Sequence, residues 1–235
     1  MKKLKSIGII GQGFVGTAVN EGLKKHFQVE TFDLIQEKST CKSIQELVNK
    51  TQAVFVCIPT PMQNNGSCYL GFVEKANSIE DFKNQNRIII GGPRPSSTVF
   101  KRIFSKAFPK VPIIKTGSTT AEMVKYFANC FLANKVSFAN EMYEICKGLK
   151  IDYDKIVEYA KYDERIGYSH LNVPGPDGDF GYGGHCFPKD VKALISLAHS
   201  LNISPKMLIA TDEKNNQVRK NRDWEKQEGR AVINK

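Results

Sequence analysis

Short apolar runs alternate with longer amphipathic stretches through the first half of the chain. The apolar runs have the length and the β-branched content of buried strands, and they occupy residues 5–11, 29–33, 53–60, 87–92 and 111–117. The stretches between them repeat apolar positions every three or four residues, as amphipathic helices do, at residues 14–27, 43–50, 72–82 and 98–108. Strands that alternate with helices form a parallel sheet with helices on both faces. The first half therefore predicts a doubly wound α/β domain.

The hydrophobic pattern changes after Gly117. Residues 119–149 keep a helical spacing without a break, and more helix follows around a loop rich in glycine and proline at residues 173–184. Helices without intervening strands predict a separate all-helical domain. We therefore expect an α/β domain at residues 1–117, a helical domain at residues 118–205, and a C-terminal helix with a tail at residues 206–235.

A glycine-rich turn, GQGFVG, joins the first predicted strand to the first predicted helix. Gly11, Gly13 and Gly16 allow the backbone to turn tightly and to approach a pyrophosphate without a Cβ in the way. Phe14 and Val15 open the helix, whose first amides point at the bound anion. The position of the motif, between a strand and a helix, predicts a Rossmann-like dinucleotide site.

Asp33 closes the second predicted strand, where an acidic side chain bonds the ribose 2′-hydroxyl of a dinucleotide. A carboxylate there repels the 2′-phosphate of NADP, so the sequence predicts NAD as the cofactor. The alternative is that the glycines serve only packing and that Asp33 is only a turn residue.

Composition narrows the class of protein. The chain has 235 residues, of which 41% are hydrophobic and 25% are charged, as is typical of a globular protein. No apolar run reaches the roughly 18 residues of a membrane span, and the first residues lead directly into a strand without a cleavage signal. We therefore expect a cytoplasmic protein with no membrane partner.

The charge and the cysteines exclude further classes. The net charge of +10 is spread along the chain without an arginine-rich arm or a helix-turn-helix pattern, so we expect no nucleic-acid partner. A small polyanionic ligand explains the charge equally well. The six cysteines lie far apart without a CxxC pair, which predicts neither a disulfide framework nor a metal site.

Two polar constellations interrupt the helical half. Lys125 and Asn129 are four residues apart and share one face of the long predicted helix. The alternative is that this pair belongs to an ordinary solvent-exposed face without a function. The segment FGYGGHCFPKD places Cys186 after three glycines and shortly before Lys189. Lys125 and Lys189 are candidate sources of the positive charge that favours a reactive thiolate. A structural turn with an incidental thiol is the alternative.

Together these segments resemble the UDP-glucose/GDP-mannose dehydrogenase family. The resemblance covers most of the chain and rests on GQGFVG, VCIPTPMQNNGSC, AEMVKYFANCFLANKVSFANEMYEIC, DERIG, VPGPDGDFGYGGHCFPKD and the tail NNQVRKNRDWEKQEGRAV. It implies oxidation of the C6 alcohol of a nucleotide sugar to a carboxylate, foremost UDP-glucose to UDP-glucuronate, with two NAD and without release of the aldehyde. It also agrees with a homodimer formed through the long helix, which carries the apolar side chains Phe127, Phe131, Phe138 and Met142.

The resemblance implies a role for four catalytic residues. Cys186 would be the nucleophile that forms a thiohemiacetal and then a thioester. Lys125 and Asn129 would stabilise the oxyanion, and Asp190 would support water and proton transfer.

The resemblance also implies binding residues. Arg165 and the loop that contains Gly183 would hold the nucleotide sugar together with Lys125, because glycine-rich backbone closes readily over a diphosphate. Pro59 and Thr60, in the PTP segment, would contact NAD.

The chain departs from the family pattern after the PTP segment. Family members continue with a KSTVPPGT-like turn and a PEFL motif, whose threonine and glutamate assist catalysis, and several dozen residues are missing here. SSTVF, at residues 96–100, resembles the threonine turn superficially, but its position fits the later helix better, so Thr98 is a weak counterpart. The glutamate has no counterpart. The matching tail favours a naturally short form over a truncation.

These departures leave the function open between three hypotheses. The first is an active nucleotide-sugar dehydrogenase. The second is a catalytically impaired relative that binds NAD or a nucleotide sugar and dimerises. The third is a β-hydroxyacid dehydrogenase of related fold, which would use a helix Lys-Asn pair but would have no need for Cys186.

Overall fold

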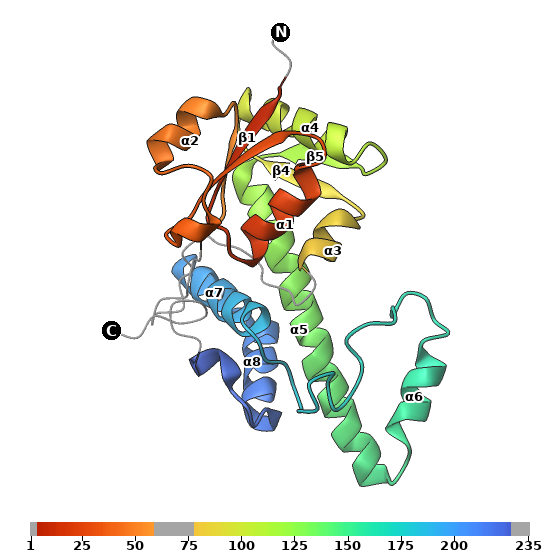
Figure 1. Ribbon diagram of the computed structural model, residues 1–235. Coiled ribbons are helices and arrows are strands. Elements are labelled where there is room, and N and C mark those ends of the chain that lie inside the picture. The colour runs from red at the N-terminus through yellow and green to blue at the C-terminus, as the bar shows by residue number, and fades with distance from the viewer. Residues whose placement is uncertain (1–3, 59–77, 227–235) are drawn as a thin grey trace. The chain divides into compact units, whose positions relative to one another are not determined.

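The computed structural model describes residues 4–58 and 78–226. These residues form two compact units: unit 1 contains residues 4–58 and 78–124, and unit 2 contains residues 125–226. Figure 1 shows the strands in the first and mainly helices in the second. The domain boundaries that the sequence predicts after residues 117 and 205 stay predictions.

Unit 1 contains parallel strands in two sheets. The first sheet places β1 (Ser6–Ile10) between β2 (Gln28–Phe32) and β3 (Val54–Val56). The second sheet pairs β4 (Ile88–Gly91) with β5 (Ile113–Thr116). Each strand overlaps an apolar run that predicted it, and the predicted α/β class is confirmed.

A shared core joins the two sheets. Ile7 and Ile9 of β1 are buried in the same cluster as Ile88 and Ile90 of β4. The sequence predicts a single sheet, whereas the described strands divide into ladders of three and two. Burial of apolar side chains, rather than a continuous ladder of backbone hydrogen bonds, therefore joins β1 to β4.

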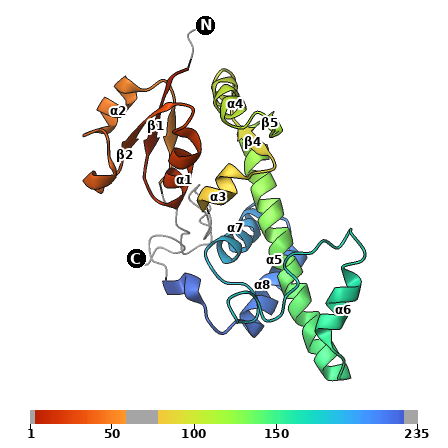
Figure 2. The ribbon, with the colours of Figure 1, turned by 45° about the vertical axis from the view of Figure 1, so that its right-hand side comes forward.

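The helices of unit 1 are α1 (Phe14–Leu23), α2 (Ile44–Lys50), α3 (Ser78–Lys83) and α4 (Ser96–Ala107), with a 3₁₀ turn, η1 (Gln36–Lys38). Successive residues of β1 point to opposite faces of the sheet. Ile7 and Ile9 pack with Leu23 of α1, while a Cβ on Gly8 would lie 2.4 Å from Leu47 of α2. Helices thus cover both faces, as predicted for a doubly wound sheet (Figure 2).

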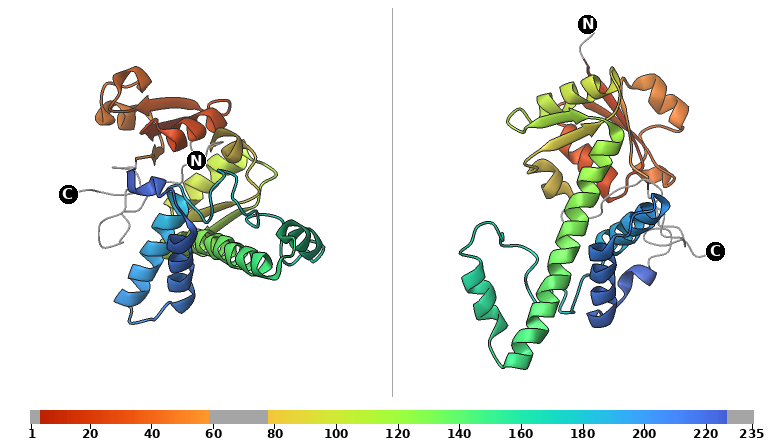
Figure 3. Two further views of the ribbon diagram at one scale, coloured as in Figure 1. Left: turned by 90° about the horizontal axis from the view of Figure 1, so that it is seen from below. Right: turned by 180° about the vertical axis from the view of Figure 1, so that it is seen from behind.

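The helices of unit 2 are α5 (Ser118–Leu149), which begins in unit 1, α6 (Tyr153–Ala160), α7 (Cys186–Ser200) and α8 (Lys206–Val218), followed by the 3₁₀ turn η2 (Asp223–Lys226). The uninterrupted helix predicted at residues 119–149 is confirmed (Figure 3). It ends where Lys150 adopts a positive φ of 59° and the amides of Lys150 and Ile151 donate to the carbonyls of Lys147 and Cys146. In the part of the chain that the structure describes, no helix is long and apolar enough to cross a membrane.

Two apolar clusters tie the irregular segment between α6 and α7 to α5. One joins Ala139, Cys146, Tyr153, Leu171 and Val173, and the other joins Cys130, Ala133, Tyr182 and Val191. In addition, the Tyr153 hydroxyl donates to the Leu171 carbonyl at 2.8 Å. The segment therefore keeps a defined path without regular secondary structure.

Another face of α5 exposes aromatic side chains. Phe127, Phe131 and Phe138 are 71%, 61% and 58% exposed, and the rings of Phe127 and Phe131 stack at 6.3 Å. The sequence groups Met142 with these exposed side chains, and that prediction is wrong. Met142 packs against the buried cluster that contains Ala139, because residues three apart lie on the same face of a helix.

Candidate active site

Asp190 of α7 is the centre of a buried polar cluster in unit 2. Its carboxylate is fully buried. The Lys125 ammonium lies 2.9 Å from Asp190 Oδ2, and the Lys189 ammonium lies 2.9 Å from Oδ1. The Asn129 amide also donates to Oδ2. The structure thus brings together Lys125, Asn129 and Asp190, which the sequence singles out from two distant segments.

The charges around Asp190 keep its carboxyl group ionised. Burial alone would raise the pKa of Asp190, but the ammonium groups of Lys125 and Lys189 outweigh that effect and hold the pKa below its ordinary value. Lys189 is buried, whereas the side chain of Lys125 is 31% exposed. Lys125 can therefore contact the buried carboxylate and a ligand at the same time.

Cys186 is the first residue of α7, and Asp190 follows one turn later on the same face of the helix. The Cys186 thiol is only partly buried. By contrast, Cys57 and Cys130 are buried, and burial raises the pKa of each thiol to about 12. Since the thiolate is the reactive form, Cys186 is better suited to nucleophilic chemistry than either of them.

The segment before Cys186 uses glycine for its backbone path. Gly181 and Gly184 have positive φ values of 67° and 71°, which side chains rarely allow. Gly183 lies against the guanidinium of Arg219, where a Cβ would come within 2.2 Å of Nη2. The sequence predicts glycine at this position because it leaves room for a substrate. The structure adds a second reason, the close contact of Gly183 with Arg219.

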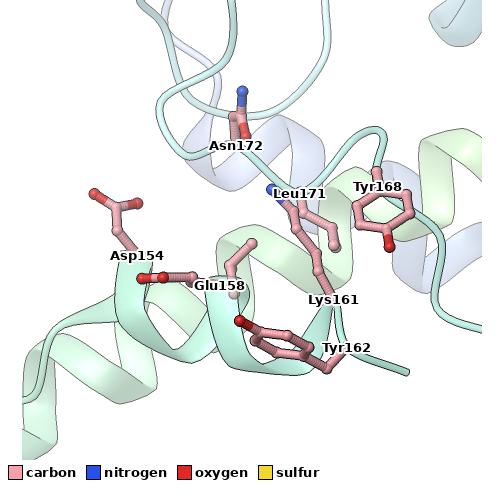
Figure 4. A pocket seen from close by; sticks show the side chains of 8 residues that line it. Asp154, Glu158, Lys161, Tyr162, Tyr168, Leu171 and Asn172 are labelled. Atoms are coloured by element: carbon pink, nitrogen blue, oxygen red, sulfur yellow. The ribbon is translucent and has the colours of Figure 1, made fainter. Parts of the chain in front are cut away.

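Arg165 lies outside the Asp190 cluster. It follows α6, its side chain is 90% exposed, and its guanidinium lies 2.6 Å from the Asp163 carboxylate. A hollow of about 350 Å³ lies between α6 and the loop at residues 168–172, lined by Asp154, Val157, Glu158, Lys161, Tyr162, Tyr168, Leu171 and Asn172. Figure 4 shows these side chains, and none of the predicted site residues is among them.

The glycine-rich turn of unit 1 lies between β1 and α1, as GQGFVG predicts. Gly11 has a positive φ of 87°, and a Cβ on Gly16 would lie 1.8 Å from the Gly11 carbonyl oxygen, so both positions exclude a side chain. Gly13 differs, because a Cβ there would meet no atom within 4 Å. Open space therefore adjoins the N-terminus of α1, where Phe14 and Val15 provide the first amides, and this arrangement fits a bound pyrophosphate.

Asp33 follows β2 and reaches the same turn. Its carboxylate accepts hydrogen bonds from the backbone amides of Gln12 at 2.5 Å and Ile35 at 2.9 Å. These bonds hold the pKa of Asp33 below its ordinary value. Because β1 lies between β2 and β3, the turn sits where the strand order changes direction, the usual ligand site of an open α/β sheet.

Other residues singled out from the sequence contribute less. Pro59 and Thr60 lie outside the described residues. Thr98 belongs to α4, as its sequence position favours, and its hydroxyl accepts a hydrogen bond from Lys115 at 3.3 Å. Within residues 4–58 and 78–226, no group of three or more His, Cys, Asp or Glu is placed to hold a metal ion.

Sequence reasoning missed two residues that contact the loop before Cys186. Asn215 of α8 bonds the backbone of Tyr182, and Arg219 at the end of α8 contacts Gly183. Their four-residue spacing in the tail motif was the available signal, because it places two polar side chains on one face of a helix.

Comparisons with known proteins match both sequence and fold. Residues 119–217 match the central domain of the UDP-glucose/GDP-mannose dehydrogenase family. Two similar relatives are the UDP-glucose 6-dehydrogenases AglM of Haloferax volcanii and TuaD of Bacillus subtilis, 33% and 35% identical over 148 residues. These matches cover 61% and 63% of this chain but 33% and 31% of the relatives. The chain therefore spans about a third of the length of the curated relatives it matches.

A solved structure supports the fold. The UDP-glucose dehydrogenase from the hyperthermophilic archaeon Pyrobaculum islandicum superposes with a TM-score of 0.80, covering 92% of this chain and 68% of that one, at 23% identity. At this identity the likeness concerns the fold, and it agrees with a Rossmann-like α/β domain followed by helices.

Proposed function

We propose that the chain is a member of the UDP-glucose/GDP-mannose dehydrogenase family, whose central domain residues 119–217 match, and that it oxidises the C6 alcohol of a nucleotide sugar in an NAD-dependent reaction. The observation that carries the proposal is the cluster of Lys125, Asn129 and Asp190, one helical turn from Cys186. UDP-glucose is the first candidate substrate, because both relatives are UDP-glucose 6-dehydrogenases. In this proposal, residues 1–117 bind the cofactor, residues 118–205 carry the catalytic cysteine, and residues 206–235 form the tail.

The glycine-rich turn would hold the cofactor. Gly11, Gly13 and Gly16 let the pyrophosphate approach the first amides of α1, and Asp33 would accept a hydrogen bond from the ribose 2′-hydroxyl. The open space beside Gly13 supports this assignment. Bound NAD would supply the hydride acceptor for each of the two oxidations. Pro59 and Thr60 are further proposed contacts, on the ground of the family resemblance.

Cys186 would hold the substrate covalently between the two oxidations. Its thiolate adds to C6 of the aldehyde, forming a C–S bond while the carbonyl electrons move to oxygen, and gives a thiohemiacetal. Loss of hydride from C6 and of the hydroxyl proton yields a thioester. Water then attacks the thioester carbon, the C–S bond breaks, and the thiolate and a carboxylate result, while the two protons of the water pass to solvent. The covalent bond explains why the aldehyde would not leave.

Lys125 and Asn129 would stabilise the negative oxygen that forms at each of these steps. The Lys125 ammonium has three donors and is directed by both carboxylate oxygens of Asp190. The lowered pKa of Asp190 makes it a weak base. We therefore propose that Asp190 orients Lys125, Asn129 and the attacking water, and that it does not act as the base that accepts a proton.

Arg165, Gly183 and Lys125 are the proposed contacts to the nucleotide sugar. The exposed Arg165 guanidinium is accessible to an anionic ligand, which would compete with its pairing to Asp163.

We also propose that the protein is a homodimer through α5. The exposed rings of Phe127, Phe131 and Phe138 form an apolar surface along this helix, of the kind that a protein association covers.

Formation of NADH with a panel of UDP- and GDP-sugars tests the function. We expect NADH with at least one of them, and a loss of about a hundredfold in Lys125→Met, which removes one oxyanion donor. Lys147→Met is the matched control, because Lys147 lies on the same helix with an exposed side chain, and it should keep the wild-type rate.

Absence of NADH with every sugar, combined with measurable NAD binding, would favour the second hypothesis, a catalytically impaired relative. NADH formation by Lys125→Met at close to the wild-type rate would contradict the assigned oxyanion site.

A further inference from the structure

The backbone of the loop before Cys186 is held by side chains from elsewhere in unit 2. The amide of Gly181 donates to Asn140 Oδ1 at 3.1 Å, and the amide of Tyr182 donates to Asn215 Oδ1 at 2.7 Å. The amide of Gly184 donates to both carboxylate oxygens of Asp223, at 3.1 and 3.0 Å. Since buried amides need partners, the path of this loop depends on the identity of these three side chains.

Asn215 makes the most complete of these contacts. It is 1% exposed. Besides accepting from the Tyr182 amide, its own amide group donates to the Tyr182 carbonyl at 3.1 Å, so it pairs with this residue as a neighbouring strand would. A Cβ on Gly181 would lie 2.3 Å from Asn215 Oδ1. The glycine therefore allows the approach of Asn215.

Arg219 fixes the carboxylates around the same loop. Its side chain is 2% exposed and lies 2.7 Å from Asp177, 3.5 Å from Asp179 and 3.5 Å from Asp223. Its Nε donates to the Asn221 carbonyl at 2.8 Å. A buried guanidinium with several carboxylate partners has little freedom to move. Arg219 thus sets the position of Asp223, the acceptor for Gly184.

We propose that Asn215 and Arg219 are positioning residues for Cys186. With Asp223 they form a tail clamp that holds the loop at residues 181–184 in the conformation from which α7 begins. Cys186 opens that helix, and Asp190 follows one turn later beside Lys125. The clamp touches none of the reacting atoms and acts through the loop. This inference rests on the proposed function, because it assigns Cys186 the role of nucleophile.

Two variants weaken the clamp conservatively. Arg219→Lys keeps the positive charge but loses the planar group that reaches several carboxylates. Asn215→Asp keeps the acceptor for the Tyr182 amide but loses the donor to the Tyr182 carbonyl. Arg222→Lys is the matched control, because Arg222 is 44% exposed and its guanidinium makes only long contacts, 3.5 Å to Glu225 and 3.4 Å to the Asn216 carbonyl.

The first measurement does not depend on activity. The rate at which iodoacetamide alkylates Cys186 is followed by mass spectrometry of its peptide in the full chain, at a temperature where each variant is folded by circular dichroism. We expect several-fold faster alkylation in Arg219→Lys and in Asn215→Asp, because the partly buried thiol becomes more accessible when the loop is released. Arg222→Lys should match the wild type. Alkylation at the wild-type rate in both folded clamp variants would overturn the proposal.

The second measurement separates positioning from folding. With the best nucleotide sugar, kcat of each folded clamp variant should fall about tenfold or more, a larger change than the rise in KM for the sugar, which Gly183 of the same loop would contact. The dissociation constant for NAD should stay close to wild type. Lower stability with unchanged kcat per folded molecule would show a merely structural role and overturn the proposal. A wild type without activity would refute the proposed function, and the alkylation rates would then decide on the clamp by themselves.

Discussion

Replacing Asp190 by asparagine removes one negative charge from a site that holds two cations. Lys189 lies 2.9 Å from Asp190 Oδ1 with 6% of its side chain exposed, and Asp190 is fully buried. Removing one partner of a buried ion pair costs about 3–5 kcal/mol, because the other charge stays buried without compensation. Lys125 is 31% exposed and can turn toward water. We therefore expect Asp190→Asn to lower the free energy of unfolding by about 3 kcal/mol, the lower end of that range.

Urea unfolding followed by the fluorescence of Trp224 measures this loss in unit 2. Trp224 is the single tryptophan of the chain and is 3% exposed. The double variant Asp190→Asn with Lys189→Met removes the stranded cation as well. It should regain part of the lost stability, so that the two substitutions are not additive.

The loss depends on pH in a defined direction. The pKa of Asp190 in the folded protein lies below its ordinary value of 3.8. Its contribution to stability is therefore complete above the pKa of the unfolded chain, and it is lost as the pH falls through the folded pKa. The gap between wild type and Asp190→Asn should stay constant from about pH 7 to about pH 5 and narrow below about pH 4. A gap under about 1 kcal/mol at neutral pH, as for a surface pair, or one that widens on acidification, would refute this reasoning.

Three further predictions concern the cofactor turn and the exposed helix face. Gly13→Ala should keep the free energy of unfolding within about 0.5 kcal/mol of the wild-type value but weaken NAD binding in calorimetry. Gly16→Ala should instead destabilise unit 1. Equal losses of stability in the two variants would contradict the open space beside Gly13. Wild type should bind NAD more tightly than NADP, and Asp33→Ala should narrow the difference; equal wild-type affinities would count against the cofactor assignment. Phe131→Lys should reduce the mass from light scattering from dimer to monomer, and a monomeric wild type at micromolar concentration would exclude the proposed dimer.

The apolar runs located the strands because their side chains are buried, and burial leaves a pattern in the sequence. Ile7 and Ile9 lie on one face of the sheet, against α1, and Gly8 between them lies on the other, against Leu47, as the alternation along a strand requires. The pattern did not reveal that the strands divide into two sheets. That division depends on which strand edges form hydrogen bonds with each other, and the hydrophobic pattern carries no information about this pairing.

The site was predictable where a local motif carries it. Lys125 and Asn129 share a helix face by spacing alone, and Cys186 and Asp190 lie in one short motif. The contacts of Lys125 and Asn129 with Asp190 depend on how α5 packs against α7, which neither motif reveals.

Other features depend on tertiary burial. Lys189 was expected only as a source of charge, and its near-complete burial against Asp190 depends on the surrounding packing. The same holds for Asn215, whose partner in the loop lies 33 residues earlier in the chain. Met142 was misplaced because an apolar residue of a helix can face its own core as well as a partner.

The formation of a covalent bond between Cys186 and the sugar is the central claim. Rapid mixing with UDP-glucose and NAD, followed by acid quenching and mass spectrometry of the Cys186 peptide, tests it directly. The sequence predicts no counterpart for the glutamate of the family pattern, and a positioned base is worth roughly a hundredfold in rate, so we expect hydrolysis of the thioester to be the slow step. We predict a burst of NADH, slow later turnover and a sugar adduct on Cys186, with no adduct in Cys186→Ser, which should still bind NAD. A linear time course without an adduct, or carboxylate formation by Cys186→Ser, would contradict the account.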